Sequence, residues 1–164
     1  MSIGYTLFME SSEMTQEIFL KELEALGYGC KNVINLESGI EIDDFFISFG
    51  FIIYLLNASD HSYNIWDSVF LERKFKFQKI IAFDLNNEFE DFDICYKNML
   101  NIVFTVMHKI SKFAIFIEDT GPEYAYLVDN DIYLNNETGI WDWRSFKDFV
   151  TGRQYKIVNS NPFK

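Results

Sequence analysis

The stretch EDFDICYKNMLNIVFTVMHKI, from Glu90 to Ile110, decides the fold of this 164-residue chain. Its apolar residues recur every three or four positions, which is the period of an α-helix. They form a broad face of Cys95, Met99, Ile102, Val103, Val106 and Ile110. The polar residues form a narrow stripe of Asp93, Lys97, Asn101, Thr105, His108 and Lys112. A helix with so narrow a polar face packs against a sheet, so we expect Cys95, Val103 and Val106 to be buried and His108 to be exposed.

The segments on both sides of this helix have the pattern of strands separated by short turns. Strands are predicted at 3–8, 30–36, 41–48, 51–57, 79–85, 113–117, 124–128 and 132–134. An N-terminal helix follows the first strand, with Ser11 or Ser12 as its N-cap and Gly27 at its end, and a last helix is predicted over 143–150. Strands in runs joined by hairpin-length turns indicate an α+β fold with a largely antiparallel sheet of about five or six strands. A chain of this length without linkers is expected to form a single domain over residues 1–164.

The acidic residues are separated from the basic ones along the chain, and the net charge is -11. Seven acids and no Lys or Arg lie between Lys31 and Arg73, and five acids lie between Lys79 and Lys97. Seven more lie between Lys112 and Arg144, again without a base. A folded domain with these stretches carries a negative field that repels nucleic acid and anionic lipid and attracts basic proteins. We therefore expect a basic protein partner, and neither nucleic acid nor membrane.

The residues that usually carry catalysis or bind cofactors give no coherent pattern. His61 lies beside Asp60 and Ser62, but catalytic partners converge from different elements and are seldom neighbours in sequence. No glycine-rich phosphate loop, no closely spaced cysteine pair and no pair of histidines one helical turn apart is present. The acidic runs also lack the central Gly and final Glu of an EF-hand loop. We expect no enzyme, no catalytic residue, no cofactor and no metal, although a weak divalent-cation site in the acidic runs stays an alternative.

Four acidic turns are candidates for the partner-binding surface: 41–44, 57–67, 88–91 and the hairpin at Asp129 and Asp131. Aromatic residues interleave with acids over 54–66, 124–133 and 141–143, as in interface hot spots that select a basic partner. The candidate binding residues are Asp43, Asp44, Asp60, Trp66, Asp67, Glu88, Glu90, Asp91, Asp129 and Asp131. We favour Asp60, Trp66 and Asp67 together with Asp43 and Asp44, because they lie in the longest stretch without a base.

Two other readings of the chain stay open. A small enzyme or ligand-binding domain with an apolar pocket is the main alternative, and an adaptor with a basic partner is another. Arg73, Lys74, Lys76 and Lys79 alternate with Phe75 and Phe77 and are interpreted as an edge strand that charge protects from aggregation. The N-terminus has no basic region before an apolar block, so we expect no signal peptide and a cytoplasmic protein.

The order of landmarks resembles that of the swarming-inhibition immunity proteins of myxobacteria and of related immunity proteins of contact-dependent inhibition systems. The matching segments are the opening strand 1–7 that runs into a helix, the strand 80–85, Met99-Leu100 in the long helix, the strands 114–117, 123–127 and 132–135, and Trp141 or Trp143. This resemblance implies a cytoplasmic antitoxin that binds and blocks the toxic C-terminal domain of a delivered effector. With the charge, it implies that the toxin is a basic protein, a nuclease. Such proteins act by binding, so the resemblance assigns no catalytic residue, and neither it nor the sequence defines the oligomeric state.

Overall fold

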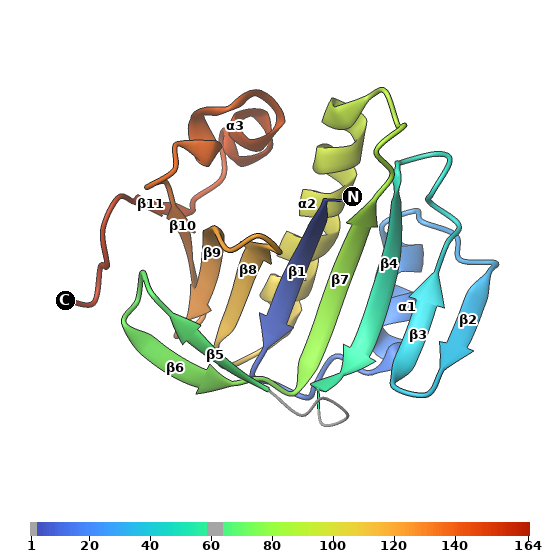
Figure 1. The fold of residues 1–164 in the computed structure, drawn as a ribbon, viewed down its shortest axis with the longest axis horizontal. Coiled ribbons are helices and arrows are strands. Elements are labelled where there is room, and N and C mark those ends of the chain that lie inside the picture. Colours follow the sequence, from blue (N-terminus) through green and yellow to red (C-terminus); the bar gives the residue numbers. More distant parts are fainter. Residues whose placement is uncertain (1–2, 59–63) are drawn as a thin grey trace.

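The computed structural model describes residues 3–58 and 64–164 and shows an α+β fold with helices packed on one face of a large, mostly antiparallel sheet (Figure 1). The elements in chain order are β1 (Gly4–Met9), α1 (Gln16–Ala25), β2 (Val33–Leu36), β3 (Gly39–Ile42), β4 (Phe51–Asn57), β5 (Ile65–Ser68), β6 (Arg73–Lys76), β7 (Lys79–Leu85), α2 (Phe92–Lys109), β8 (Ala114–Glu118), β9 (Glu123–Val128), β10 (Asp131–Asn135), the 3-10 helix η2 (Ile140–Asp142), α3 (Arg144–Val150) and β11 (Lys156–Val158). The predicted fold class is confirmed.

In the described part of the chain, the large sheet has nine strands in the order β11-β10-β9-β8-β1-β7-β4-β3-β2. Neighbouring strands are antiparallel except β10 and β11, which are parallel. The predicted sheet of about five or six strands is wrong, because the hairpins β2–β3 and β9–β10 extend the sheet at both ends and β11 adds to one of them. The short strands β5 and β6 form a separate hairpin.

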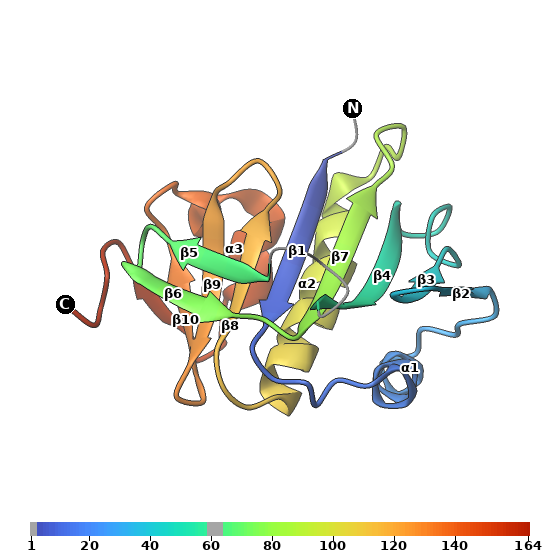
Figure 2. The ribbon, with the colours of Figure 1, turned by 60° about the horizontal axis from the view of Figure 1, so that its bottom comes forward.

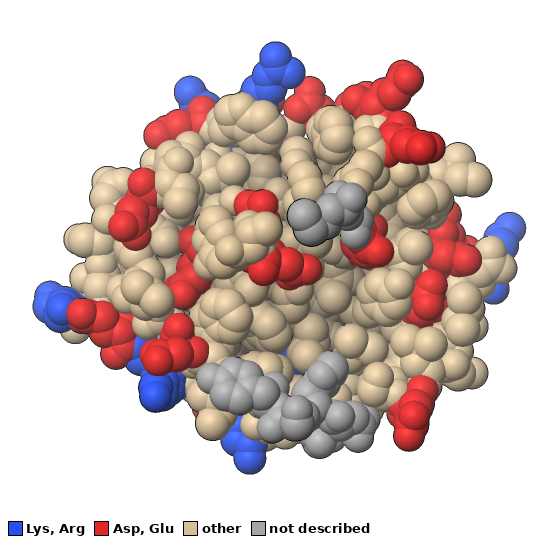
Figure 3. All heavy atoms as spheres, in the orientation of Figure 1, with Lys and Arg blue, Asp and Glu red and all other residues tan. Residues whose placement is uncertain are grey.

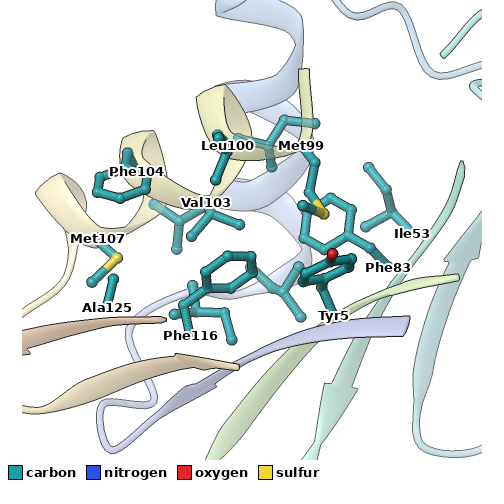
Figure 4. Packing of buried hydrophobic residues seen from close by; sticks show 14 of the residues in the cluster. Tyr5, Ile53, Phe83, Met99, Leu100, Val103, Phe104, Met107, Phe116 and Ala125 are labelled. Carbon is teal, nitrogen blue, oxygen red and sulfur yellow. The ribbon is translucent and has the colours of Figure 1, made fainter. Parts of the chain in front are cut away.

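The main core lies between the sheet and α2, as the apolar periodicity over residues 90–110 predicts. Figure 4 shows Val103 and Met107 of α2 directed at the sheet, where Phe116 and Ala125 face them, whereas Phe104 packs against Trp141 and Phe149. Such interdigitating side chains are the largest source of stability in a domain of this size. Cys95, Val103 and Val106 are buried and His108 is exposed, so these four predictions are confirmed.

The hairpin β5–β6 crosses the other face of the sheet and covers part of it (Figure 2). Its side chains Phe75 and Leu71, with Phe77 just after it, pack with Ile115 and Tyr126 in a second core. Both faces of β8 and β9 are therefore covered, which explains why every residue of β9 is buried. The part of this face that the hairpin leaves uncovered, over β1, β7 and β4, is called the open face below.

Two predicted element boundaries are wrong for local reasons. The N-cap of α1 is Thr15, whose side chain accepts a hydrogen bond from the Ile18 amide, while Ser11 instead accepts one from the Glu13 amide. The strand predicted over 41–48 ends at Ile42, and the chain then turns so that the amides of Phe49 and Gly50 donate to the Phe45 carbonyl. Gly50 has a φ of 81°, a conformation that glycine adopts without strain.

None of the helices in the described ranges combines the length and apolar character needed to cross a membrane.

Candidate partner-binding surface

Two of the four predicted acidic turns lie together at one end of the sheet. β3 and β7 run in the same direction, so the segments 43–50 and 86–91 that follow them start from the same end (Figure 1). The Asn86 amide donates to the Gly50 carbonyl at 2.7 Å, and a Cβ on Gly50 would lie 2.4 Å from the Phe89 ring. The two segments are thus in close contact. We call the surface made by segments 43–50 and 86–94 together with Trp143 the acidic end.

The acidic end has no Lys or Arg in either segment and exposes several large apolar side chains. Their exposed fractions are 87% for Ile47, 39% for Phe46, 40% for Phe92, 41% for Ile94 and 49% for Trp143. Phe92 and Trp143 both contact Tyr96, which places them on one patch. Exposed aromatic side chains inside an acidic rim have the composition of a hot spot for a basic partner.

The predicted carboxylates at the acidic end differ in their roles. Asp44 accepts hydrogen bonds from the amides of Lys31 and Asn32 at 2.7 and 2.9 Å and so fixes the chain before β2. Asp91 is the N-cap of α2 and accepts from the Ile94 amide. One carboxylate oxygen of Asp43 is buried and has no hydrogen-bond partner among the described residues. Glu88 and Glu90 are exposed, which leaves their charges available to a partner.

The other predicted binding residues do not all join this end. Trp66 and Asp67 belong to β5, on the hairpin beside the open face, and Asp67 pairs with Lys74 at 3.8 Å. Asp129 and Asp131 lie at the opposite end of the sheet, because β9 runs opposite to β7.

Asp131, in the hairpin between β9 and β10, forms an ion pair with Lys156 at 2.9 Å. Asp60 lies outside the described residues. The structure therefore separates Asp43 and Asp44 from Trp66 and Asp67, and it groups the first pair with Glu88, Glu90 and Asp91.

Acidic residues that the sequence analysis did not select gather on the open face. The strand register places Tyr54 of β4 opposite Glu41 and Ala82, and it places Asp84 opposite Gly4. Across this face, Figure 3 shows acidic side chains in the middle, while nearly all visible Lys and Arg lie at the rim. Alternation along β7 could have found Asp84, because Ile81, Phe83 and Leu85 occupy the buried face of that strand.

The open face is hollowed into a groove that we call the sheet groove. One part, of about 530 Å³, is lined by Ile3, Gly4, Tyr54, Ala82, Phe83, Asp84, Asp119 and Thr120. The next part, of about 400 Å³, is lined by Thr6, Phe8, Ile65, Trp66, Phe77, Ile80, Ile117 and Asp119. Asp119 is common to both parts, so the groove runs from the end of β8 to Trp66 on the hairpin. No Lys or Arg is among these lining residues.

Asp119 is held over the backbone of β1. Its Oδ1 accepts a hydrogen bond of 2.6 Å from the Thr6 hydroxyl, and its amide donates to the Gly4 carbonyl. A Cβ on Gly4 would lie 2.0 Å from Asp119 Oδ2, so a residue with a side chain at position 4 would displace the carboxylate. Burial raises the pKa of Asp119, and the charges of Asp84 and Glu118 add to this, while the bond from Thr6 opposes it.

The hairpin that borders the groove is fixed by a buried carboxylate. Glu123 of β9 is only 7% exposed and accepts hydrogen bonds from the Ser68 hydroxyl at 2.6 Å and the Tyr126 hydroxyl at 2.9 Å. It also accepts from the Val69 amide at 3.2 Å and from Trp66 Nε1 at 3.4 Å. Trp66 stacks on Phe8 of β1. Trp66 is therefore partly a structural residue as well as a wall of the groove.

His61 lies outside the described residues, and His108, Cys30 and Cys95 are the described groups with catalytic potential. His108 contacts the Tyr155 hydroxyl on the exposed side of α2. Burial raises the pKa of Cys95 to about 12, and burial with the charges of Asp44 and Glu24 raises that of Cys30 to about 11, so neither thiol is activated. In the described residues, no group of three or more His, Cys, Asp and Glu side chains is placed to hold a metal ion.

The comparison with protein families gives one result that covers most of the chain. A family model described as SitI3-like matches residues 3–144. The matched range includes the acidic end and the strands that form the sheet groove. No curated protein and no solved structure matches the chain.

Proposed function

The chain belongs to the SitI3-like family of toxin-immunity proteins, and we propose that it binds and neutralises the toxic C-terminal domain of a cognate delivered effector in the cytoplasm. The observation that carries this proposal is the family match over residues 3–144. The activity proposed here is binding, without catalysis and without a cofactor.

The charge distribution supports a basic toxin domain as the partner. The acidic end and the open face adjoin, because β1 starts and β7 and β8 end at the same end of the sheet. The described surface therefore presents carboxylates and exposed aromatic side chains to a partner, and segments 43–50 and 86–94 contain no Lys or Arg between them.

A basic nuclease is the toxin that best fits this surface. Nucleases hold nucleic-acid phosphates with Lys and Arg side chains, and the same side chains would pair with the exposed carboxylates Glu88 and Glu90. Occupying them would keep RNA or DNA from the active site or from its substrate-binding surface. The long-range attraction between opposite charges would also raise the association rate, which matters for a protein that has to capture a toxin before it acts.

Growth rescue tests this proposal. Cells that express the cognate toxin domain should survive when this chain is co-expressed. The double variant Glu88→Lys with Glu90→Lys should lose protection. Glu24→Lys with Glu37→Lys changes the net charge equally, at exposed positions on α1 and in the β2–β3 turn, and should keep it.

The sequence-based choice of surface is tested in the same assay. Reversal of Asp43, Asp44, Asp60 and Asp67 together should abolish protection, and reversal of Asp129 and Asp131 should leave it intact. Circular dichroism of each purified variant separates lost binding from lost folding, which is needed because Asp44 holds two backbone amides. Failure of the unmodified chain to protect against this toxin domain would contradict the proposal.

A further inference from the structure

The sheet groove has the features of a binding site for one long cationic side chain. Its lining combines the apolar side chains of Ile3 and Ala82 with the carboxylates of Asp84 and Asp119. Long cationic side chains bury their methylene stems on apolar surface while the charged group reaches a polar one. Tyr54 adds an aromatic ring to the same hollow.

Nothing in the described residues neutralises these carboxylates. The ion pairs of the described chain involve Glu10, Glu17, Glu22, Asp67, Glu72 and Asp131, and thus neither Asp84, Asp119 nor Glu41. The charges also act on one another. Burial, Glu41 and Asp84 together raise the pKa of Tyr54, and Asp84 contributes to the raised pKa of Asp119. A bound cation would relieve this repulsion.

The position of Asp119 depends on two specific neighbours. The Thr6 hydroxyl orients the carboxylate, and the absence of a side chain at Gly4 gives it room above β1. The carboxylate thereby lies in the same part of the groove as Asp84, which projects from β7 on the same face of the sheet. Two carboxylates beside an aromatic ring suit a planar guanidinium, which bonds carboxylates in pairs and stacks on aromatic faces, better than an ammonium group.

We propose that the sheet groove binds an arginine side chain of the toxin domain, with its guanidinium between Asp84 and Asp119 and its stem on Ala82 and Tyr54. This inference rests on the proposed function and adds the chemical identity of the anchoring residue. It also assigns a binding role to Gly4 and Thr6, which position Asp119 without contacting the guanidinium.

A peptide titration tests the groove without the toxin. Acetylated tetra-arginine amide and tetra-lysine amide are added to the full ¹⁵N-labelled chain at low salt, and amide shifts are followed. The arginine peptide should shift Gly4, Ala82, Asp84 and Thr120 and should bind more tightly than the lysine peptide. Asp84→Asn with Asp119→Asn should weaken its binding about tenfold or more, which corresponds to a total loss of at least about 1.4 kcal/mol.

Two further variants separate the groove from general acidity. Glu24→Gln with Glu37→Gln removes the same charge at exposed positions on α1 and in the β2–β3 turn and should change the affinity by less than about twofold. Gly4→Ala displaces Asp119 at constant charge and should weaken binding as the double variant does.

Equal affinity for both peptides, shifts confined to other surfaces, or equal losses in the two double variants would overturn the inference. The proposed function can survive this result, because a toxin complex that forms with unchanged affinity in Asp84→Asn with Asp119→Asn would refute only the arginine anchor. A variant-sensitive dimer in sedimentation would show instead that a second copy occupies the groove.

Discussion

Replacing Glu123 with alanine should detach the β5–β6 hairpin from the sheet and strongly destabilise the protein. The carboxylate is 7% exposed and accepts from the buried hydroxyls of Ser68 and Tyr126. A hydrogen bond to a charged group contributes about 1.5–3 kcal/mol, so loss of the acceptor for these two donors predicts a decrease of about 3–6 kcal/mol in the free energy of unfolding. That is a large share of the about 5–15 kcal/mol that keeps a typical domain folded.

Urea unfolding of Glu123→Ala measures this loss, and native-state hydrogen exchange over residues 65–76 locates it. Amides of the hairpin should exchange faster than those of α2, because α2 packs in the other core. Glu123→Gln keeps one oxygen acceptor and should lose less stability than Glu123→Ala. A double-mutant cycle with Ser68→Ala should give a coupling of about 1.5–3 kcal/mol. A loss below about 1 kcal/mol for Glu123→Ala, with unchanged hairpin exchange, would refute the anchoring role.

Three further predictions concern a helix cap, the core and the groove. Asp91→Ala should lower the free energy of unfolding by about 1 kcal/mol through the lost cap of α2, whereas Asp91→Asn keeps a capping oxygen and removes only the charge, so thermal melts of the two should differ. Leu100→Ala should lower the free energy of unfolding by about 2–5 kcal/mol in denaturant titrations, because the Leu100 side chain of α2 is fully buried. A smaller loss would contradict the packing. The raised pKa of Asp119 means that the folded state binds more protons than the unfolded state between the unfolded and folded pKa values, so stability falls as pH rises through this window. Asp119→Asn should remove this fall, which urea unfolding across mildly acidic pH measures, and an unchanged pH profile would contradict the shift.

The sequence predicts the central elements well because their patterns are long and physically simple. The strands 51–57 and 79–85 and the helix 92–109 agree closely with the predicted ranges. Each buries one face, so period two or period 3.6 is visible in the residues themselves. β8 and β9 were also found, although both of their faces are buried, because turns at Gly121-Pro122 and at Asp129 mark their limits.

The elements that were missed depend on contacts that a local pattern does not contain. β5 has an exposed Ile65 and Asp67 and becomes a strand by pairing with β6 and by bonding Glu123, a residue 55 positions away from Ser68. β11 has three residues and exists through its pairing with β10. The strand predicted over 41–48 ends at Ile42 and is followed by turns, because Asp44 bonds the amides of residues 31 and 32.

The candidate binding surface was predictable only in composition. The sequence shows which acids lack nearby bases in the chain, but the grouping of Asp43 with Glu88 follows from the shared direction of β3 and β7. Asp119 reaches the groove because Gly4 and Thr6, over one hundred positions earlier, make room for it and bond it. Contacts between such distant segments can be predicted only when the order of the strands in the sheet is known.

The salt dependence of toxin binding is the most direct test of the central claim, that this chain neutralises a basic toxin domain through an acidic surface. The purified chain and its cognate toxin domain are mixed in a stopped-flow instrument, at salt concentrations from about 50 mM to about 500 mM. We expect a complex at every salt concentration, with an association rate that falls steeply as salt increases, while the dissociation rate changes little. Glu88→Lys with Glu90→Lys should lower the association rate at low salt. Absence of a complex at low salt, or an association rate independent of salt, would contradict the account.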